Sequence, residues 1–83
     1  MLILYNLDNS LIEITENFPS NFTGIIEWGD GSKEWSFEDK LHRLDGPALI
    51  DAHGKKYWYI HDEEVTELEC KLLHDIMKLK GLL

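Results

Sequence analysis

The 83-residue sequence has one cysteine, two prolines and no long hydrophobic run. Because a disulfide needs two cysteines, the single Cys70 excludes an internal disulfide framework and is typical of a reducing compartment. The apolar start, Met1 to Tyr5, is too short for a signal peptide and lacks its positive flank. No apolar run approaches the roughly 20 residues that span a bilayer. We therefore expect a cytoplasmic protein.

Positive charge is scarce, since 8 Lys and Arg stand against 16 Asp and Glu, a net charge of −8. Residues 1–32 contain five acids and no Lys or Arg, whereas residues 66–83 are neutral. A negative field repels nucleic acids and anionic membranes, so we expect direct binding to neither. It favours a partner with a basic surface. The alternative reading is that the charge only keeps the protein soluble.

Apolar and aromatic residues are plentiful: 43% of the chain is hydrophobic, with three each of Trp, Tyr and Phe. A chain of this length buries only about 60–65% of its unfolded surface, but this composition is enough for one domain with a real core. We therefore expect a single domain over residues 1–83, with an N-terminal hairpin and loop (1–23), two β-repeat units (24–65) and a C-terminal helix (66–83).

Short apolar and β-branched runs separated by turn residues predict an antiparallel sheet of about six strands. The expected strands are Leu2–Tyr5, Leu11–Thr15, Gly24–Trp28, Lys33–Phe37, Pro47–Asp51 and Lys56–Ile60, with a brief edge strand at Glu63–Val65. The charged segment Glu38–Gly46 is interpreted as a connecting arm. From the loop Asn17–Thr23, Phe18 and Phe22 are expected to fold back onto the core.

An internal repeat organises the middle of the chain. Gly31 and Gly54 lie 54 − 31 = 23 residues apart, and Trp35 and Trp58 are separated by the same interval. Each glycine ends a three-residue turn between strands, where a positive φ is expected. Trp35 and Trp58 are predicted to point inward. Trp28 breaks the pattern, because its counterpart is Asp51.

The C-terminal segment has the signature of a capped amphipathic helix. Thr66 and Glu69 form a capping box, and a helix of about Glu67 to Lys80 follows. Its apolar stripe comprises Leu68, Leu72, Leu73, Ile76, Met77 and Leu79. We expect this stripe to cover one sheet face. The predicted fold class is α+β, an antiparallel β-hairpin meander with one C-terminal α-helix.

The segment from His42 to Ala48 reads HRLDGPA and is followed by Gly54 and the sequence YWY at residues 57–59. This pattern resembles the MORN-like HRxDGPA…WY repeats found in small proteins of bacteriophages and large viruses. The resemblance implies stacked β-hairpins, a viral or prophage origin, and a binding role with no known common activity. The chain departs from the pattern at residues 22–25, which read FTGI in place of DGPA, and at His61-Asp62, where Asn-Gly is usual. Both departures suggest an array of two units closed at its ends.

Residue types that carry chemistry do not form a recognisable constellation. His42, His53, His61 and His74 are 11, 8 and 13 residues apart, which matches no short metal-ligand pattern. The turn at residues 29–31 is not followed by a helix, so it does not read as a phosphate loop. Cys70 flanks the helical stripe and is interpreted as a structural thiol. We predict no enzyme, no metal and no cofactor.

The predicted function is therefore binding. The candidate protein-binding residues are Glu13, Glu16, Glu27, Trp28, Asp30, Tyr57 and Tyr59. We expect a small acidic phage-type protein that inhibits or modulates a host cytosolic protein. In a sharper form of this hypothesis, the chain mimics nucleic acid and blocks the nucleic-acid cleft of a defence enzyme (an anti-defence role). It would then work in the host cytoplasm. The alternative is a structural module that assembles with itself as a homodimer or larger homo-oligomer, and a small hydrolase is the least favoured reading.

Overall fold

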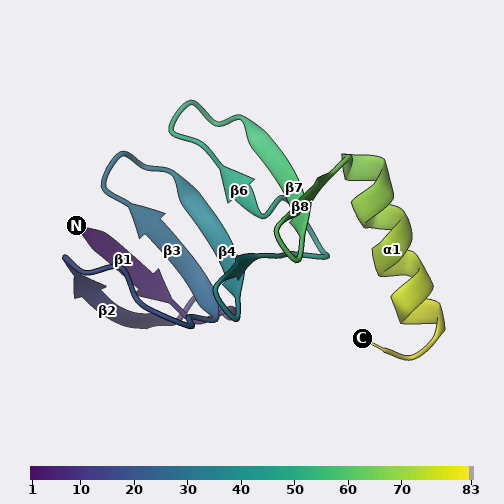
Figure 1. The fold of residues 1–83 in the computed structure, drawn as a ribbon, viewed down its shortest axis with the longest axis horizontal. Helices are drawn as coiled ribbons and strands as arrows, with labels where there is room; N and C mark the ends of the chain where they lie inside the picture. The colour runs from purple at the N-terminus through teal and green to yellow at the C-terminus, as the bar shows by residue number, and fades with distance from the viewer. Residues whose placement is uncertain (83) are drawn as a thin grey trace.

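The computed structural model describes residues 1–82 and has the predicted α+β class, an antiparallel sheet followed by one helix (Figure 1). The strands are β1 (Leu2–Tyr5), β2 (Leu11–Thr15), β3 (Gly24–Trp28), β4 (Lys33–Phe37), β5 (Lys40–Leu41), β6 (Leu49–Ile50), β7 (Lys56–Ile60) and β8 (Glu63–Val65), and the helix is α1 (Glu67–Leu79). The strand order is β2-β1-β3-β4-β6-β7-β8, with β5 also paired to β4.

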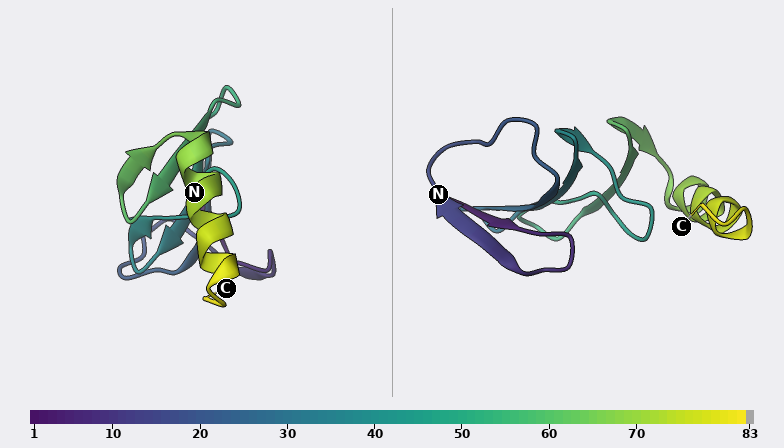
Figure 2. Two further views of the ribbon diagram at one scale, coloured as in Figure 1. Left: turned by 90° about the vertical axis from the view of Figure 1, so that its right-hand side faces the viewer. Right: turned by 90° about the horizontal axis from the view of Figure 1, so that it is seen from below.

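The molecule is elongated, with extents of 39 × 26 × 19 Å. The β1–β2 hairpin lies at one end of the strand array and α1 at the other, as Figure 1 and the right view of Figure 2 show. In residues 1–82 no helix has the length and hydrophobicity that crossing a membrane requires.

The two repeat units have the same turn geometry at the predicted interval. In the first, the Trp28 amide donates to Ser32 and the Gly31 amide donates back to Trp28. In the second, Asp51 bonds to Lys55, and the Gly54 amide donates to Asp51. Gly31 and Gly54 have φ values of +91° and +85°, so the recurrence of glycine has the expected conformational cause.

The expected strand count and connecting arm need correction. The sheet has eight strands rather than about six, and β6 spans two residues of the expected Pro47–Asp51. The expected arm begins with a tight turn at Glu38-Asp39 (φ +48° and +69°) followed by β5. This turn repeats at His61-Asp62 (φ +48° and +67°), where a two-residue turn was predicted. Two successive positive φ angles are typical of type I′ hairpins.

The main core lies beneath the first strands. Leu2, Leu4 and Ile26 form a buried cluster, and Phe22 and Trp28 pack against it. Phe22 therefore folds back from its loop as predicted, whereas Phe18 stays 57% exposed. In the second unit the expected inward tryptophan, Trp58, is half-buried, as is Trp35 in the first.

The helix begins as predicted and packs differently from the prediction. Thr66 caps it with both bonds of the capping box, and it ends at Leu79, one residue before the expected Lys80. Of its residues only Cys70 is buried, while the exposed apolar side chains are Leu68, Leu72, Ile76 and Leu79. The helix lies at the end of the strand array (Figure 1). Of the six residues of the predicted apolar stripe only Leu73 and Met77 are half-buried, so most of the stripe covers no sheet face.

Candidate protein-binding face

One face of the sheet carries a row of residues contributed by strands far apart in sequence. The successive register partners are Glu13, Leu4, Ile26, Glu34, Leu49 and Tyr57. Residues that pair across an antiparallel sheet point to the same side, and so do residues two apart along a strand. Trp28 and Tyr59 therefore share this side. We call this whole side of the sheet the tyrosine face. Its central residues are Trp28, Glu34, Leu49, Tyr57 and Tyr59.

The helix packs at the end of the strand array, near the side of β7 that is opposite to the tyrosines. Trp58 alternates with the two tyrosines along β7, and it lines a cavity of about 270 Å³ together with Cys70 and His74 of α1. Tyr57 and Tyr59, which were predicted to bind a partner, therefore point away from the helix. The five central residues of the tyrosine face are all half-buried.

Charge is sorted between the two faces. In the strands of residues 1–82, the tyrosine face has three acids, Glu13, Glu34 and Glu64, and no Lys or Arg. The opposite face has two acids, Glu27 and Glu63, and three lysines, Lys33, Lys40 and Lys56. The negative field of the strands is thus concentrated on the tyrosine face.

Further acids surround the tyrosines. The Tyr57 hydroxyl donates to the Asp51 carboxylate at 3.4 Å. Burial, and then the nearby Glu64 carboxylate, raise the pKa of Tyr59 above its usual 10.0. The ammonium of Lys55 lies 5.3 Å from the centre of the Tyr57 ring. Tyr57 is thus a hydroxyl donor, and the two tyrosines have acids nearby and one cation, Lys55, at their edge.

Trp28 is anchored rather than freely exposed. Its indole N–H donates to Glu34 Oε2 at 2.6 Å, and its ring packs against Phe18 at 5.5 Å between centroids. Glu34 was missed at the sequence level. The signal was available, because a hairpin turning at residues 29–31 brings β4 beside β3 and places Trp28 and Glu34 on one face.

The seven predicted binding residues do not form one patch. Glu13 and Tyr57 lie on the same face, but five strand spacings of about 4.8 Å separate them by about 24 Å along the sheet. Glu27 points to the opposite face and pairs with Lys33 at 3.9 Å. Glu16 lies beyond the end of β2, 3.8 Å from the N-terminal amine.

Asp30 lies in the β3–β4 turn, where its carboxylate accepts hydrogen bonds from Ser32 and has a lowered pKa as a result. Of the predicted residues, the structure therefore brings Trp28, Tyr57 and Tyr59 onto one surface, with Glu13 at its far edge.

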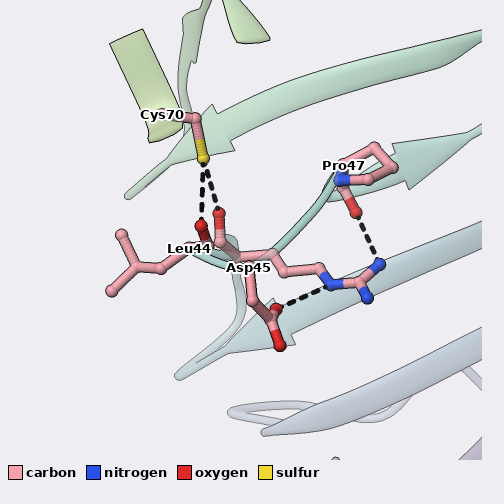
Figure 3. A network of polar contacts seen from close by, with 5 residues as sticks. Leu44, Asp45, Pro47 and Cys70 are labelled. Carbon is pink, nitrogen blue, oxygen red and sulfur yellow. Dashed lines mark hydrogen bonds and ion pairs between the residues drawn. The ribbon is translucent and has the colours of Figure 1, made fainter. Parts of the chain in front are cut away.

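The HRLDGP segment has a structural role on the opposite face (Figure 3). The Arg43 guanidinium lies 4.0 Å from the Trp35 ring centre, while its Nε donates to Asp45 at 3.0 Å and an Nη donates to the Pro47 carbonyl at 3.1 Å. The Cys70 thiol donates to the carbonyls of Arg43 and Leu44. These contacts join the segment to both β4 and α1.

Cys70 is buried and His42 is half-buried in this region, and this burial shifts the pKa of each group. Burial raises the pKa of the Cys70 thiol, so it is a protonated donor and not a nucleophilic thiolate. Burial, and secondarily the neighbouring His61, lowers the pKa of His42, whose ring stacks on that of His61 at 4.2 Å. His42 Nδ1 accepts the His61 backbone N–H at 3.1 Å, which joins the two repeat units.

An open cavity of about 500 Å³ lies beside this segment, lined by Leu7, Trp35, Phe37, His42 and Arg43 among others. Of its polar lining, Arg43 and His42 make the contacts described above. In the part of the chain that the structure describes, no three His, Cys, Asp or Glu side chains gather as metal ligands.

No family model, no curated protein and no solved structure matches this chain. The resemblance to MORN-like repeats therefore stays a prediction.

Proposed function

We propose that this chain is a non-enzymatic protein-binding module whose tyrosine face docks onto a basic surface of a cytosolic protein and inhibits or modulates it. If a phage encodes the chain, that partner is a host protein. The proposal rests on the sorting of strand charges: in the strands of residues 1–82, the side that carries Trp28, Tyr57 and Tyr59 has three acids and no Lys or Arg, and Lys55 of the β6–β7 turn lies at its edge. Direct binding of nucleic acids or membranes is disfavoured by the same charge.

Two physical properties suit this face to binding. Tyrosine and tryptophan are enriched at binding hot spots, because each adds a large contact area at little cost in side-chain entropy. Here the rings are pre-oriented, Trp28 by Glu34 and Tyr57 by Asp51. The surrounding carboxylates would accelerate encounter with a basic partner and select against acidic ones. The sharper form of the proposal is that these carboxylates occupy a nucleic-acid cleft of a defence or transcription enzyme.

The chain contains a matched pair for testing the face. Glu63 and Glu64 are neighbours on β8 with the same chemistry, but they point to opposite faces. A partner is first captured from host lysate and identified, and its affinity for the purified chain is then measured. We expect Glu64→Gln to weaken binding about threefold to tenfold and Glu63→Gln to leave it unchanged, with the effect reduced at high salt.

Truncation of a tyrosine side chain provides a second test in the same binding measurement. Tyr59→Ser should weaken binding more than Glu64→Gln, because hot-spot truncations cost more than the loss of rim charges. Equal effects of the two glutamate variants, or a partner lost only with Glu63→Gln, would contradict the proposal. Circular dichroism of each variant controls for folding.

The second candidate function, self-assembly, is favoured by a different observation. The outer side of α1 exposes apolar side chains at the end of the molecule opposite the β1–β2 hairpin.

A further inference from the structure

We propose that two copies of this chain pair through α1, with the two helices antiparallel and in contact along the outer stripe, defined as Leu68, Leu72, Ile76 and Leu79. This inference concerns a surface separate from the tyrosine face, and it does not depend on the proposed function.

The outer stripe is continuous and points away from the sheet. Its side chains are 65%, 52%, 48% and 88% exposed in chain order. At about 100° per residue these four positions fall within an arc of about 80° on the helix surface. Cys70, which is 2% exposed, lies on the other side and faces the Arg43 and Leu44 carbonyls. Single exposed apolar residues are ordinary, but a contiguous row marks a contact surface.

The spacing of the stripe fits an antiparallel partner. Its midpoint lies near residue 74, so a twofold axis there places Leu72 opposite the partner's Ile76 and Leu68 opposite the partner's Leu79. A twofold interface uses the same patch on both copies and closes after two. The stripe thus supplies both sides of its own contact.

The charges that flank the stripe also favour the antiparallel arrangement. Glu69 and Lys80 lie on one flank, and the twofold axis brings Glu69 of each copy near Lys80 of the other. Lys71 and Asp75 lie on the other flank, and the same axis brings Lys71 of each copy near Asp75 of the other. A parallel pair would instead bring Lys78 near the partner's Lys80, and it would align the two helix dipoles unfavourably.

The charge of the rest of the molecule also favours pairing through α1. Residues 1–65 hold thirteen acids against five Lys and Arg, whereas residues 66–83 are neutral. Because the outer stripe points away from the sheet, pairing through it holds the two acidic bodies on opposite sides of the neutral helix pair, which limits their mutual repulsion. The neutral segment is thus the part of the chain best suited to meet its own copy.

The size of the contact sets the expected strength. The 13 residues of α1 span only about 20 Å, and one face of a helix of this length buries less than the roughly 800 Å² per partner that is typical of stable interfaces. We therefore expect a weak, reversible dimer that forms as concentration rises, rather than an obligate one.

Analytical ultracentrifugation over a wide concentration range tests the pairing. We expect the mass to rise from one chain toward two. Leu72→Glu should weaken dimerisation at least about tenfold, because it places two charges in the contact. The matched control is Leu11→Glu on β2, where Leu11 is 58% exposed and Leu72 is 52% exposed; this variant should dimerise like the wild type. A chain that is monomeric at every concentration, or that loses its dimer with Leu11→Glu alone, overturns the proposal.

Two further measurements test the orientation. Lys71→Glu should weaken the dimer severalfold, and adding Asp75→Lys to the same chain should restore it. Under mild oxidation, a mixture of the Leu72→Cys and Ile76→Cys variants should form a mixed disulfide in preference to either self-linked product. Preferential linking within the Leu72→Cys variant alone would indicate parallel helices and overturn the arrangement. Because the tyrosine-face variants do not alter the stripe, failure of either proposal leaves the other open to its own test.

Discussion

The first hairpin unit, β3 to β5, and the second, β6 to β8, have the same turns but continue differently. In the first unit Ser36 pairs with Leu41, and 23 residues later Tyr59 pairs with Glu64 in the same way. After β5 the chain returns through Gly46 to form β6, which pairs with β4. After β8 the chain enters a capped helix instead. The comparison teaches that the repeat ends where a local helix signal replaces the segment that would start a third hairpin.

The largest expected difference between the units is in their packing. Ile26 and Leu49 occupy equivalent positions, but Ile26 is 2% exposed within the core cluster and Leu49 is half-buried. We expect Ile26→Ala to lower the free energy of unfolding by about 3 kcal/mol and Leu49→Ala by about 1 kcal/mol. Urea unfolding measures both. Equal losses would mean that the second unit is packed as tightly as the first. As a control for side-chain shape, Ile26→Val should lower the free energy of unfolding by only about 1 kcal/mol.

A smaller loss of stability is expected at the helix cap, where the chain enters α1 after the second unit. Thr66→Ala removes the acceptor for the Glu69 amide and should lower the free energy of unfolding by about 1 kcal/mol, while Thr66→Ser should retain most of it. Urea unfolding followed by the helical circular dichroism signal measures the loss. No change in stability with Thr66→Ala would show that tertiary contacts, and not the cap, end the array.

The same cap has a pH dependence of known sign. Hydrogen bonds from the Thr66 backbone N–H and hydroxyl lower the pKa of Glu69 below its ordinary 4.5. The stabilisation is therefore present above that pH, and it is lost as the pH falls through the lower, folded pKa. The Thr66→Ala chain should accordingly lose less helical signal than the wild type on acidification.

The smallest expected difference is in the tight turns. Asp39 and Asp62 have φ values of +69° and +67°, so glycine suits both positions. Asp62 also accepts the Leu41 amide at 2.7 Å across the units. We expect Asp39→Gly to raise the free energy of unfolding by about 0.5 kcal/mol, and Asp62→Gly to leave it almost unchanged, because the lost hydrogen bond offsets the relief of strain. Thermal unfolding of both variants measures the difference, and equal stabilisation would show that the Asp62 bond adds nothing.

The features predicted correctly are those with strong local signals. The bounds of β1, β2, β3, β4, β7 and β8 follow from short apolar runs between turn residues. Gly31, Gly54 and the Thr66–Glu69 box mark conformations that neighbouring backbone atoms determine. The turn at Glu38-Asp39 was missed because it lacks an Asn-Gly pair. Only its position, one repeat interval before His61-Asp62, indicates it in the sequence.

The candidate site was less predictable because it depends on register. The sequence singled out Trp28, Tyr57 and Tyr59, which share a face, together with Glu27, which does not. A shift of one residue in pairing would move every strand side chain to the other face. Glu34 and Glu64 become part of the site only once β4 and β8 have their partners.

The sequence by itself determined the strands, the recurring turns and the capped helix, because interactions within a few residues specify each of them. Only the tertiary structure decided which charges share a face with the tyrosines, and that Leu68, Leu72, Ile76 and Leu79 remain exposed. Both outcomes depend on how distant strands pair and where the helix comes to lie. Hydrophobic periodicity shows that a face seeks apolar contact, but it does not say whether the same chain or another one provides it.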